Sequence, residues 1–333
     1  MKGIALVGLG EIGRAAHLPA ILRNPDVTLR AVVEPDPAQL ARADLPPGVD
    51  VHPDLAAVLD RPDVDGVVLA TPPWVTPGLA VAAARRGRFV LAEKPVATSV
   101  AAGAAYDVLT PTERARIQVG LTYRHDPAMV ALRDVIAAGE LGDRLLVRAH
   151  VYDEQRTSDA AHTELIERTL RHGSPVVHEG AHVFDWLRYL LGAEPELRDA
   201  WSLRTRDGLA APNLVGARLR YGPAEALVEF GWLTDVLPRT ELSVLGDRGL
   251  AVLDGRTFAL TVTTGDDRMV IDPVPDRATR CFDRQLARFV ALGGGRGGGR
   301  GGGRGGGAAA EPDLDDGLRA LAVSELVERA GAA

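Results

Sequence analysis

Cysteine is almost absent from this chain of 333 residues. The single one, Cys281, excludes an internal disulfide and any zinc site built from several thiolates. Long apolar runs are also lacking, because charge or proline interrupts every stretch that approaches the roughly 20 residues of a membrane span. The start runs into a strand-and-glycine pattern by residue 8, which leaves no room for a signal peptide. We therefore expect a soluble, cytoplasmic protein without a membrane partner.

Basic charge is in the minority, and lysine is rare. Lys and Arg together number 38 against 45 for Asp and Glu, giving a formal net charge of −7, which argues against a nucleic-acid partner. Lysine occurs only at Lys2 and Lys94. A chain this biased toward arginine uses lysine where an ammonium group is required, and Lys94, at the end of an apolar run, is the informative one.

Short apolar runs alternate with Ala-rich helical stretches through the first 120 residues, a pattern typical of a parallel sheet covered on both faces. The expected strands are Ile4–Val7, Val27–Val33, Val67–Ala70, Phe89–Ala92 and Ile117–Val119. With right-handed crossovers these residues predict a doubly wound α/β Rossmann domain over residues 1–122.

The pattern changes after about Tyr123. A helix over Pro127–Ala138 is expected to end at Gly139, and strand-like segments then follow one another without helices between them. These segments are Leu145–Tyr152, Leu214–Tyr221, Ala226–Trp232, Glu241–Leu245, Leu250–Leu253 and Phe258–Thr263. Residues 123–333 are therefore predicted to form an α+β domain with an open, mostly antiparallel sheet that binds substrate and supports a homodimer or homotetramer.

A GGGR repeat occupies Gly293–Gly307. It is expected to be a flexible surface loop, because glycine-rich segments cannot offset their ordering entropy by packing. An RGG-type RNA contact is the alternative, but no aromatic residues are interleaved. Apolar residues from Leu314 to Leu326 then return to helical spacing, which predicts a packed C-terminal helix.

A glycine-rich turn follows the first strand and opens a helix, which is the context required of a dinucleotide site. The glycines permit a tight turn, close approach of a pyrophosphate and helix–strand packing, while free N–H groups at the helix start bind the anion. Glu34 ends the second strand and can accept hydrogen bonds from both ribose hydroxyls, which favours NAD over NADP. The predicted cofactor-binding residues here are Gly8, Gly10, Glu11, Ile12, Gly13 and Glu34. A glycine-rich turn without ligand is the alternative.

Four further motifs follow in order. They are Ala70-Thr71-Pro72, Glu93-Lys94-Pro95, Tyr123-Arg124-His125-Asp126-Pro127 and Gly180-x-His182-x-x-Asp185. Together they resemble the Gfo/Idh/MocA family of sugar and inositol oxidoreductases over nearly the whole chain. The resemblance implies that Thr71, Pro72 and Glu93 also contact the cofactor.

The same resemblance implies hydride transfer between nicotinamide and a secondary alcohol carbon of a sugar, cyclitol or sugar derivative. Neutral imidazole suits His182 to the role of base, and an ammonium suits Lys94 to holding the developing alkoxide. Arg124 is expected to reach the substrate or to brace the domain junction. Asp185 is expected to bind substrate hydroxyls or to serve only as a helix charge.

Three positions depart from the family pattern. His178 stands where many members have Asp; as a third catalytic residue it could orient the substrate hydroxyl or relay a proton. Pro73 replaces Asn and Thr76 replaces His after the Thr-Pro pair. These changes question simple inositol dehydrogenase activity more than the fold.

Residues 178–182 also spell H-E-x-x-H, a zinc-binding spacing on a helix. No recognised third ligand follows and Gly180 weakens the helix, so no metal is expected. The sequence predicts an NAD(P)-dependent dehydrogenase acting on CH–OH groups. A redox-neutral sugar enzyme that recycles bound NAD, and a non-catalytic NAD-binding sensor, are the alternatives.

Overall fold

The computed structural model describes residues 1–157, 159–292 and 310–332, so the GGGR repeat lies outside the described residues. Contacts between residues divide the chain into two compact units. Unit 1 comprises Met1–Thr122 with Ala278–Leu318, and unit 2 comprises Tyr123–Arg277 with Arg319–Ala333. The expected continuous second domain over 123–333 differs from this division, because apolar side chains of the segment after Arg277 join a core of unit 1.

Unit 1 is built on a parallel sheet of six strands in the order β3-β2-β1-β4-β5-β6. The strands are β1 (Lys2–Val7), β2 (Val27–Val33), β3 (Asp50–His52), β4 (Gly66–Leu69), β5 (Phe89–Glu93) and β6 (Ile117–Gly120). Their central residues are buried on both faces, which explains the unbroken apolar runs in the sequence. The order reverses beside β1, which is where open parallel sheets bind their ligands.

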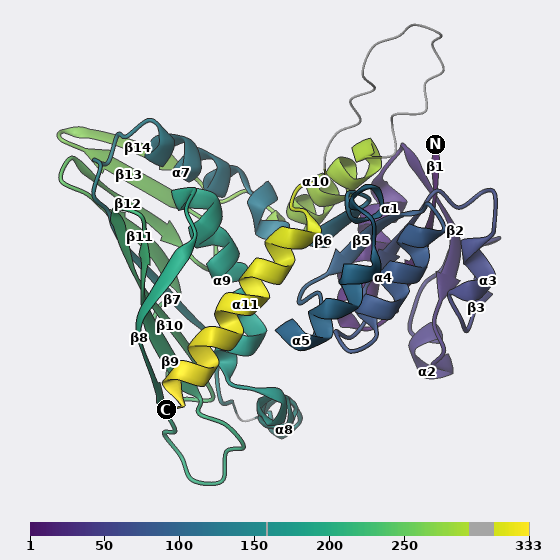
Figure 1. The fold of residues 1–333 in the computed structure, drawn as a ribbon, viewed down its shortest axis with the longest axis horizontal. Helices are drawn as coiled ribbons and strands as arrows, with labels where there is room; N and C mark the ends of the chain where they lie inside the picture. Colours follow the sequence, from purple (N-terminus) through teal and green to yellow (C-terminus); the bar gives the residue numbers. More distant parts are fainter. Residues whose placement is uncertain (158, 293–309, 333) are drawn as a thin grey trace, which may run out of the picture. The chain divides into compact units, whose positions relative to one another are not determined.

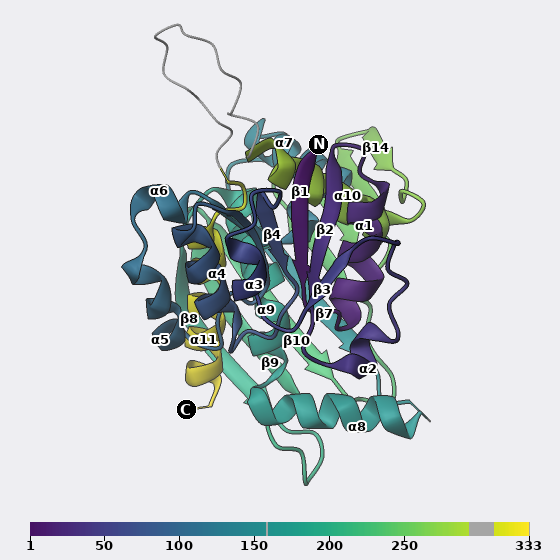
Figure 2. The same cartoon turned by 90° about the vertical axis from the view of Figure 1, so that its right-hand side faces the viewer.

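Helices cover both faces of this sheet (Figure 2). The helical segments of unit 1 are the π-helix η1 (Gly13–His17), α1 (Leu18–Arg23), α2 (Pro37–Leu40), α3 (Ala56–Leu59), α4 (Thr76–Arg85), α5 (Val100–Gly103), η2 (Ala104–Val108), α6 (Pro111–Arg114), α10 (Arg277–Leu292) apart from its first residue, and the start of α11 (Leu314–Gly331). One core gathers α3 and α4 against the sheet. The other gathers α1 and α10, including the buried Phe289.

Unit 2 carries an eight-stranded sheet in the order β14-β13-β12-β11-β7-β10-β9-β8. The strands are β7 (Leu146–Glu154), β8 (Pro195–Leu203), β9 (Leu214–Tyr221), β10 (Ala224–Trp232), β11 (Glu241–Leu245), β12 (Gly249–Asp254), β13 (Leu260–Thr264) and β14 (Asp267–Ile271). Every neighbouring pair is antiparallel except β7 with β10. This confirms the predicted fold class, a Rossmann sheet followed by an open, mostly antiparallel sheet.

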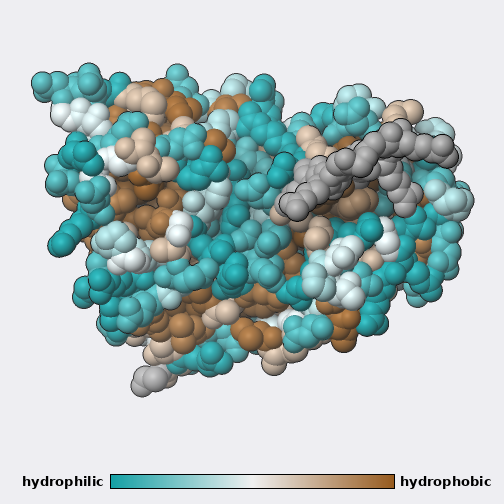
Figure 3. All heavy atoms as spheres, turned by 45° about the horizontal axis from the view of Figure 1, so that its top comes forward, coloured by the Kyte–Doolittle hydropathy of each residue, from teal (hydrophilic) through white to brown (hydrophobic). Residues whose placement is uncertain are grey.

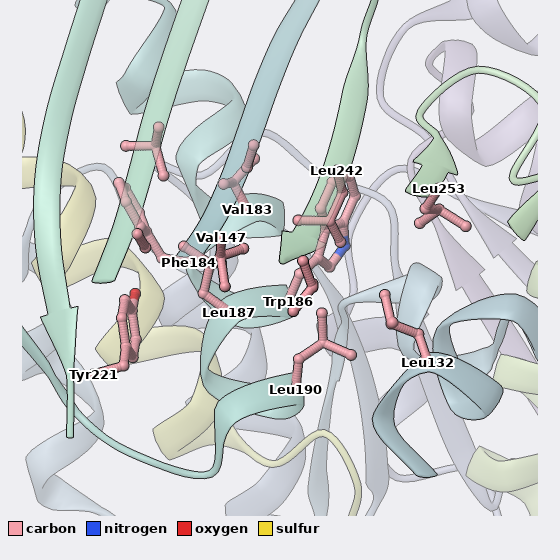
Figure 4. Close-up of a cluster of buried hydrophobic side chains, with 14 of the residues drawn as sticks. Leu132, Val147, Val183, Phe184, Trp186, Leu187, Leu190, Tyr221, Leu242 and Leu253 are labelled. Atoms are coloured by element: carbon pink, nitrogen blue, oxygen red, sulfur yellow. The ribbon is translucent and has the colours of Figure 1, made fainter. Parts of the chain in front are cut away.

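The helical segments of unit 2 are η3 (Thr122–His125), α7 (Pro127–Ala137), α8 (Ala160–Thr169), η4 (Leu170–His172), α9 (Pro175–Leu191) and the end of α11. Figure 1 shows α7, α9 and α11 on the same side of the eight-stranded sheet. Figure 4 shows Phe184, Trp186 and Leu187 of α9 among the apolar side chains of that core. The surface in Figure 3 is mostly hydrophilic, with apolar residues in separate patches.

Several elements differ from the sequence-based expectation. The strand expected from Phe258 begins two residues later, since Phe258 closes a turn with φ of 58°. β8, β14 and α8 were not expected: β14 is largely exposed, and α8 has little apolar surface to bury. No helix in the described part of the chain is long and apolar enough to cross a membrane.

Candidate functional site

The glycine-rich turn after β1 contains glycines that the packing requires and one, Gly10, that it does not. A Cβ on Gly8, whose φ is +91°, would lie 2.4 Å from the carbonyl oxygen of Ala70, and one on Gly13 would lie 2.1 Å from that of Gly8. The protein's own packing therefore requires both. A Cβ on Gly10 would meet nothing within 4 Å. The open space beside Gly10 fits a phosphate group approaching the backbone, as the second glycine of this motif allows.

Glu34 lies beside this turn. Its carboxylate is buried and accepts hydrogen bonds from the backbone N–H groups of Leu9, at 2.7 Å, and Asp36, at 2.9 Å. The predicted acid and the predicted glycines are therefore brought together. The predicted Glu11 and Ile12 lie at the start of the following helix, and both are exposed.

Thr71 and Pro72 follow β4 at the neighbouring strand end. The hydroxyl of Thr76 lies 2.8 Å from that of Thr71 and donates toward the carbonyls of Thr71 and Pro72, at 3.1 and 3.0 Å. Thr76 is fully buried. This residue, which departs from the family pattern, therefore holds the turn that carries the two predicted cofactor contacts.

The Glu93-Lys94-Pro95 segment follows β5. Glu93 is buried, and its carboxylate accepts from the Lys94 backbone N–H at 3.2 Å and lies 2.7 Å from Nε2 of His17. His17 is not among the residues predicted from the sequence. Its signal is a histidine on an otherwise apolar helical stretch, and the π-helical turn Gly13–His17 obscures the periodicity that places it inward.

In unit 2 the long helix α9 carries the remaining predicted site residues. Pro175 occupies its first turn, and it ends at Gly192 in the left-handed conformation. Gly180 has a packing role, because a Cβ there would lie 2.5 Å from the Ser324 hydroxyl oxygen and 2.9 Å from the Phe184 ring. The glycine that weakens the helix in isolation thus permits close approach of α11.

His182 lines a cavity of about 820 Å³ formed within unit 2. Its imidazole lies against the Tyr123 ring, with 4.6 Å between ring centroids. Phe258 lines the cavity as well, 5.2 Å from Tyr123, and so does Trp186. Aromatic rings and a titratable imidazole thus share one concave surface, as in small-molecule sites.

Ionisable groups of this cavity have perturbed pKa values, among them Tyr152 and Asp254. Burial raises the pKa of Tyr152 well above its usual range, and the hydrogen bond it donates to Glu229 raises it further. Tyr152 is therefore a neutral phenol and unsuited to act as a base. Burial would raise the pKa of Asp254, but hydrogen bonds from Thr257 N–H and Arg239 outweigh it and lower that pKa to about 2.

The predicted substrate residues Arg124 and Asp185 face each other instead of this cavity. Nε of Arg124 donates to the two carboxylate oxygens of Asp185 at 3.0 and 2.9 Å, and both side chains are buried. Neither residue lines the cavity that contains His182. Their contact with substrate stays a prediction, while their ion pair braces unit 2.

His178 lies one helical turn before His182. Its ring stacks on Trp232, with 5.2 Å between centroids, and Trp232 donates from Nε1 to Asp153 at 2.7 Å. Among the described residues, His178 is not part of the cavity lining. Its catalytic role also stays a prediction. No group of three or more His, Cys, Asp or Glu residues within the described ranges could hold a metal ion.

Family models match both units. Residues 2–121 match the oxidoreductase family with an NAD-binding Rossmann fold, and residues 129–252 match the GFO/IDH/MocA C-terminal domain. The chain belongs to the Gfo/Idh/MocA family. This confirms the predicted family and the predicted enzyme class, an NAD(P)-dependent dehydrogenase acting on CH–OH groups.

Three similar proteins show what this chain resembles. Inositol 2-dehydrogenase from Acidothermus cellulolyticus is 27% identical, over 86% of this chain and 83% of its own. The dTDP-3,4-didehydro-2,6-dideoxy-alpha-D-glucose 3-reductase of Streptomyces antibioticus is 26% identical, over 87% and 89%. The crystal structure of an oxidoreductase from Agrobacterium radiobacter, in complex with NAD+, L-tartaric acid and magnesium, has a TM-score of 0.81 at 18% identity, over 99% and 96%.

Proposed function

We propose that this protein transfers a hydride between the nicotinamide of NAD and a secondary alcohol carbon of a sugar, cyclitol or sugar derivative. The observation that carries the proposal is the position of His182, a buried imidazole facing a cavity of about 820 Å³ lined by aromatic and polar side chains. That surface suits a polyhydroxylated ring, with apolar faces for its carbons and polar groups for its hydroxyls.

The residues of unit 1 fit a dinucleotide. The open space at Gly10 accommodates a pyrophosphate, and the Glu34 carboxylate has lone pairs left for ribose hydroxyls after accepting from Leu9 and Asp36. Negative charge at Glu34 opposes the extra phosphate of NADP, which is why NAD is proposed. When bound, the nicotinamide ring accepts or supplies the hydride.

The chain's own residues manage the proton. His182 in its neutral form accepts the hydroxyl proton as the carbonyl develops, and it returns that proton in the reverse direction. The Lys94 ammonium holds the oxygen whose charge grows during transfer. The hydrogen bond from the Lys94 N–H to the buried Glu93 carboxylate fixes the backbone from which this ammonium projects.

The test is NADH formation by the purified protein with NAD and a panel of inositols, sugars and sugar acids, with Lys94→Met and His182→Ala alongside. We expect each substitution to lower kcat by about 100-fold or more, the usual effect of removing an acid–base or oxyanion-stabilising group. Substrate conversion without net NADH would favour the redox-neutral alternative. NAD binding without conversion of any member would favour the sensor.

Cofactor choice is tested by Glu34→Gln. The substitution removes the negative charge that repels the extra phosphate of NADP, and it keeps a side chain that can form hydrogen bonds. We therefore expect the ratio of kcat/KM for NADP to that for NAD to rise by about tenfold, equivalent to 1.4 kcal/mol. Asp36→Asn is the matched control, because Asp36 caps α2 through Ala38. An unchanged ratio in the Glu34 variant would contradict the assignment.

We also infer a homodimer or homotetramer located in the cytoplasm. The support for assembly is the eight-stranded sheet, whose helices α7, α9 and α11 lie on one side in Figure 1. An open sheet gains stability when a second copy covers its other face. Light scattering coupled to size-exclusion chromatography measures the assembly state directly.

A further inference from the structure

Arg277 occupies an unusual position in the cavity that contains His182. It is the first residue of α10, and its guanidinium carbon lies 3.8 Å from the centroid of the Phe258 ring and 5.2 Å from that of Tyr123. Stacking of this kind fixes the plane of a guanidinium group and leaves its N–H edge available for hydrogen bonds. The edge is therefore oriented before any ligand arrives.

That edge is incompletely satisfied. Nη1 of Arg277 is buried and has no hydrogen-bond partner among the described residues. A buried donor without a partner is costly, more so when it is charged, so each case calls for an explanation. A ligand group that accepts hydrogen bonds would supply one.

The acidic residues of the cavity do not supply the missing hydrogen-bond partner of Arg277. Asp254 holds Arg239 at 2.9 Å, Asp153 accepts from Trp232 at 2.7 Å, and no ion pair within the described ranges joins Arg277 to these two acids or to Glu179. Two further arginines, Arg239 and the exposed Arg256, line the same cavity. The cavity lining is balanced in formal charge, with three arginines and three acids, so it is the unpartnered Nη1 of Arg277 that calls for an acceptor from outside the chain.

Tyr123 lies between the Arg277 guanidinium and His182, the proposed base. The centroid of its ring lies 4.6 Å from that of the His182 imidazole and 5.2 Å from the guanidinium carbon of Arg277. A ring-sized substrate lying along Tyr123 could therefore present a hydroxyl to His182 and a substituent to Arg277.

We propose that Arg277 binds an oxyanion carried by the substrate, either a carboxylate or a phosphate. The inference rests on the proposed function and narrows it, from sugars and cyclitols in general to their anionic derivatives. A guanidinium fork pairs with carboxylate and phosphate oxygens through two parallel hydrogen bonds, which a neutral hydroxyl cannot match. Arg277 is on this view a specificity-determining residue.

The first test measures binding without turnover. Calorimetric titrations of the whole protein with NADH present compare D-glucuronate and D-glucose 6-phosphate with neutral D-glucose and myo-inositol. We expect at least one anion to bind about 10- to 100-fold more tightly than the neutral ligands, as a charged hydrogen bond allows. Tighter binding of glucuronate identifies a carboxylate, and tighter binding of the phosphate identifies a phosphate ester. Equal binding of anionic and neutral ligands would overturn the proposal.

The second test changes the residue. Arg277→Met should abolish the preference for the anion, so that anionic and neutral ligands bind with similar affinity. Arg277→Lys should keep a minor part of the preference, because the positive charge remains while the paired N–H donors of the guanidinium are lost. Arg280→Met is the matched control, an exposed arginine one turn further along α10. Should Arg277→Met fail to fold, the lysine variant decides. A full anion preference in either variant would contradict the role of Arg277.

Turnover separates this inference from the proposed function. Anion binding that depends on Arg277, without NADH formation from any substrate, would uphold the site and remove the dehydrogenase proposal. NADH formation from both neutral and anionic substrates, with a kcat/KM for the anionic ones that Arg277→Met leaves unchanged, would uphold the dehydrogenase and remove the anion site.

Discussion

The imidazole of His17 and the carboxylate of Glu93 form a buried pair, with 2.7 Å between Nε2 and Oε1. The π-helical turn Gly13–His17 directs the histidine inward, and Gly120 makes room for the acid, because a Cβ there would lie 2.7 Å from the same oxygen. The other carboxylate oxygen accepts from the Lys94 N–H at 3.2 Å. The glycine-turn helix and the segment bearing Lys94 thus meet through one acid.

His17→Ala should therefore destabilise unit 1. It removes one hydrogen-bond partner of the buried Glu93 carboxylate, and leaving a buried acceptor short of a partner costs about 1–3 kcal/mol. Urea denaturation followed by circular dichroism measures the loss, with His172→Ala as the control because His172 is exposed. Equal stability of the two variants would mean that the pair contributes little.

The glycines of the turn should separate folding from cofactor binding. Gly13→Ala places a methyl group 2.1 Å from a carbonyl oxygen and should lower the free energy of unfolding by about 1–3 kcal/mol, the cost of overpacking. Gly10→Ala meets open space and should leave stability unchanged, while weakening NADH binding by about tenfold or more, at 1.4 kcal/mol per tenfold. Thermal unfolding and fluorescence titration with NADH measure the two effects. Unaltered NADH affinity in the Gly10 variant would place the pyrophosphate elsewhere.

Arg124 and Asp185 should behave as a structural ion pair. Each single substitution, Arg124→Met or Asp185→Leu, removes one partner of the buried ion pair and leaves the other charge buried. We expect each to lower the free energy of unfolding by about 3–5 kcal/mol. The double variant should cost less than the sum of the two, because it removes both charges together. A double-mutant cycle by urea denaturation measures the coupling. Additive losses of stability, together with a higher KM in each single variant, would instead support the predicted contact with substrate.

Stability should depend on pH through Asp254, whose pKa of about 2 in the folded protein is below the ordinary value of about 3.9. Because the pKa is lowered in the folded protein, the Asp254 carboxylate contributes to stability at pH values above its ordinary pKa. This contribution disappears as the pH falls from about 4 to 2. The carboxylate is partly exposed, so the contribution at pH 7 is expected to be about 0.5–1 kcal/mol. Asp254→Asn should lower the melting temperature at pH 7 more than at pH 2.5, with the exposed Asp272→Asn as control. An equal decrease at both values would contradict the assignment.

Much of unit 1 could be predicted because its signals are local. Apolar runs buried on both faces, and glycines between a strand and a helix, depend on a few neighbouring residues and on backbone conformation. Unit 2 was harder to predict. β14 is largely exposed, and the parallel pairing of β7 with β10 joins segments about 80 residues apart. The return of the segment after Arg277 to a core of unit 1 also lacks a local signal, since it depends on which apolar face receives Phe289.

The candidate site divides in the same way. The sequence by itself determined the family, the glycine turn, Glu34 beside it and the helix that carries His182, because spacing and residue type are enough to specify them. Only the tertiary structure decided which polar groups satisfy one another. Arg124 pairs with Asp185, His17 pairs with Glu93, and Nη1 of Arg277 is buried without a hydrogen-bond partner among the described residues. The physical reason is that hydrogen bonds between residues far apart in sequence are set by packing, which no local pattern of residues encodes.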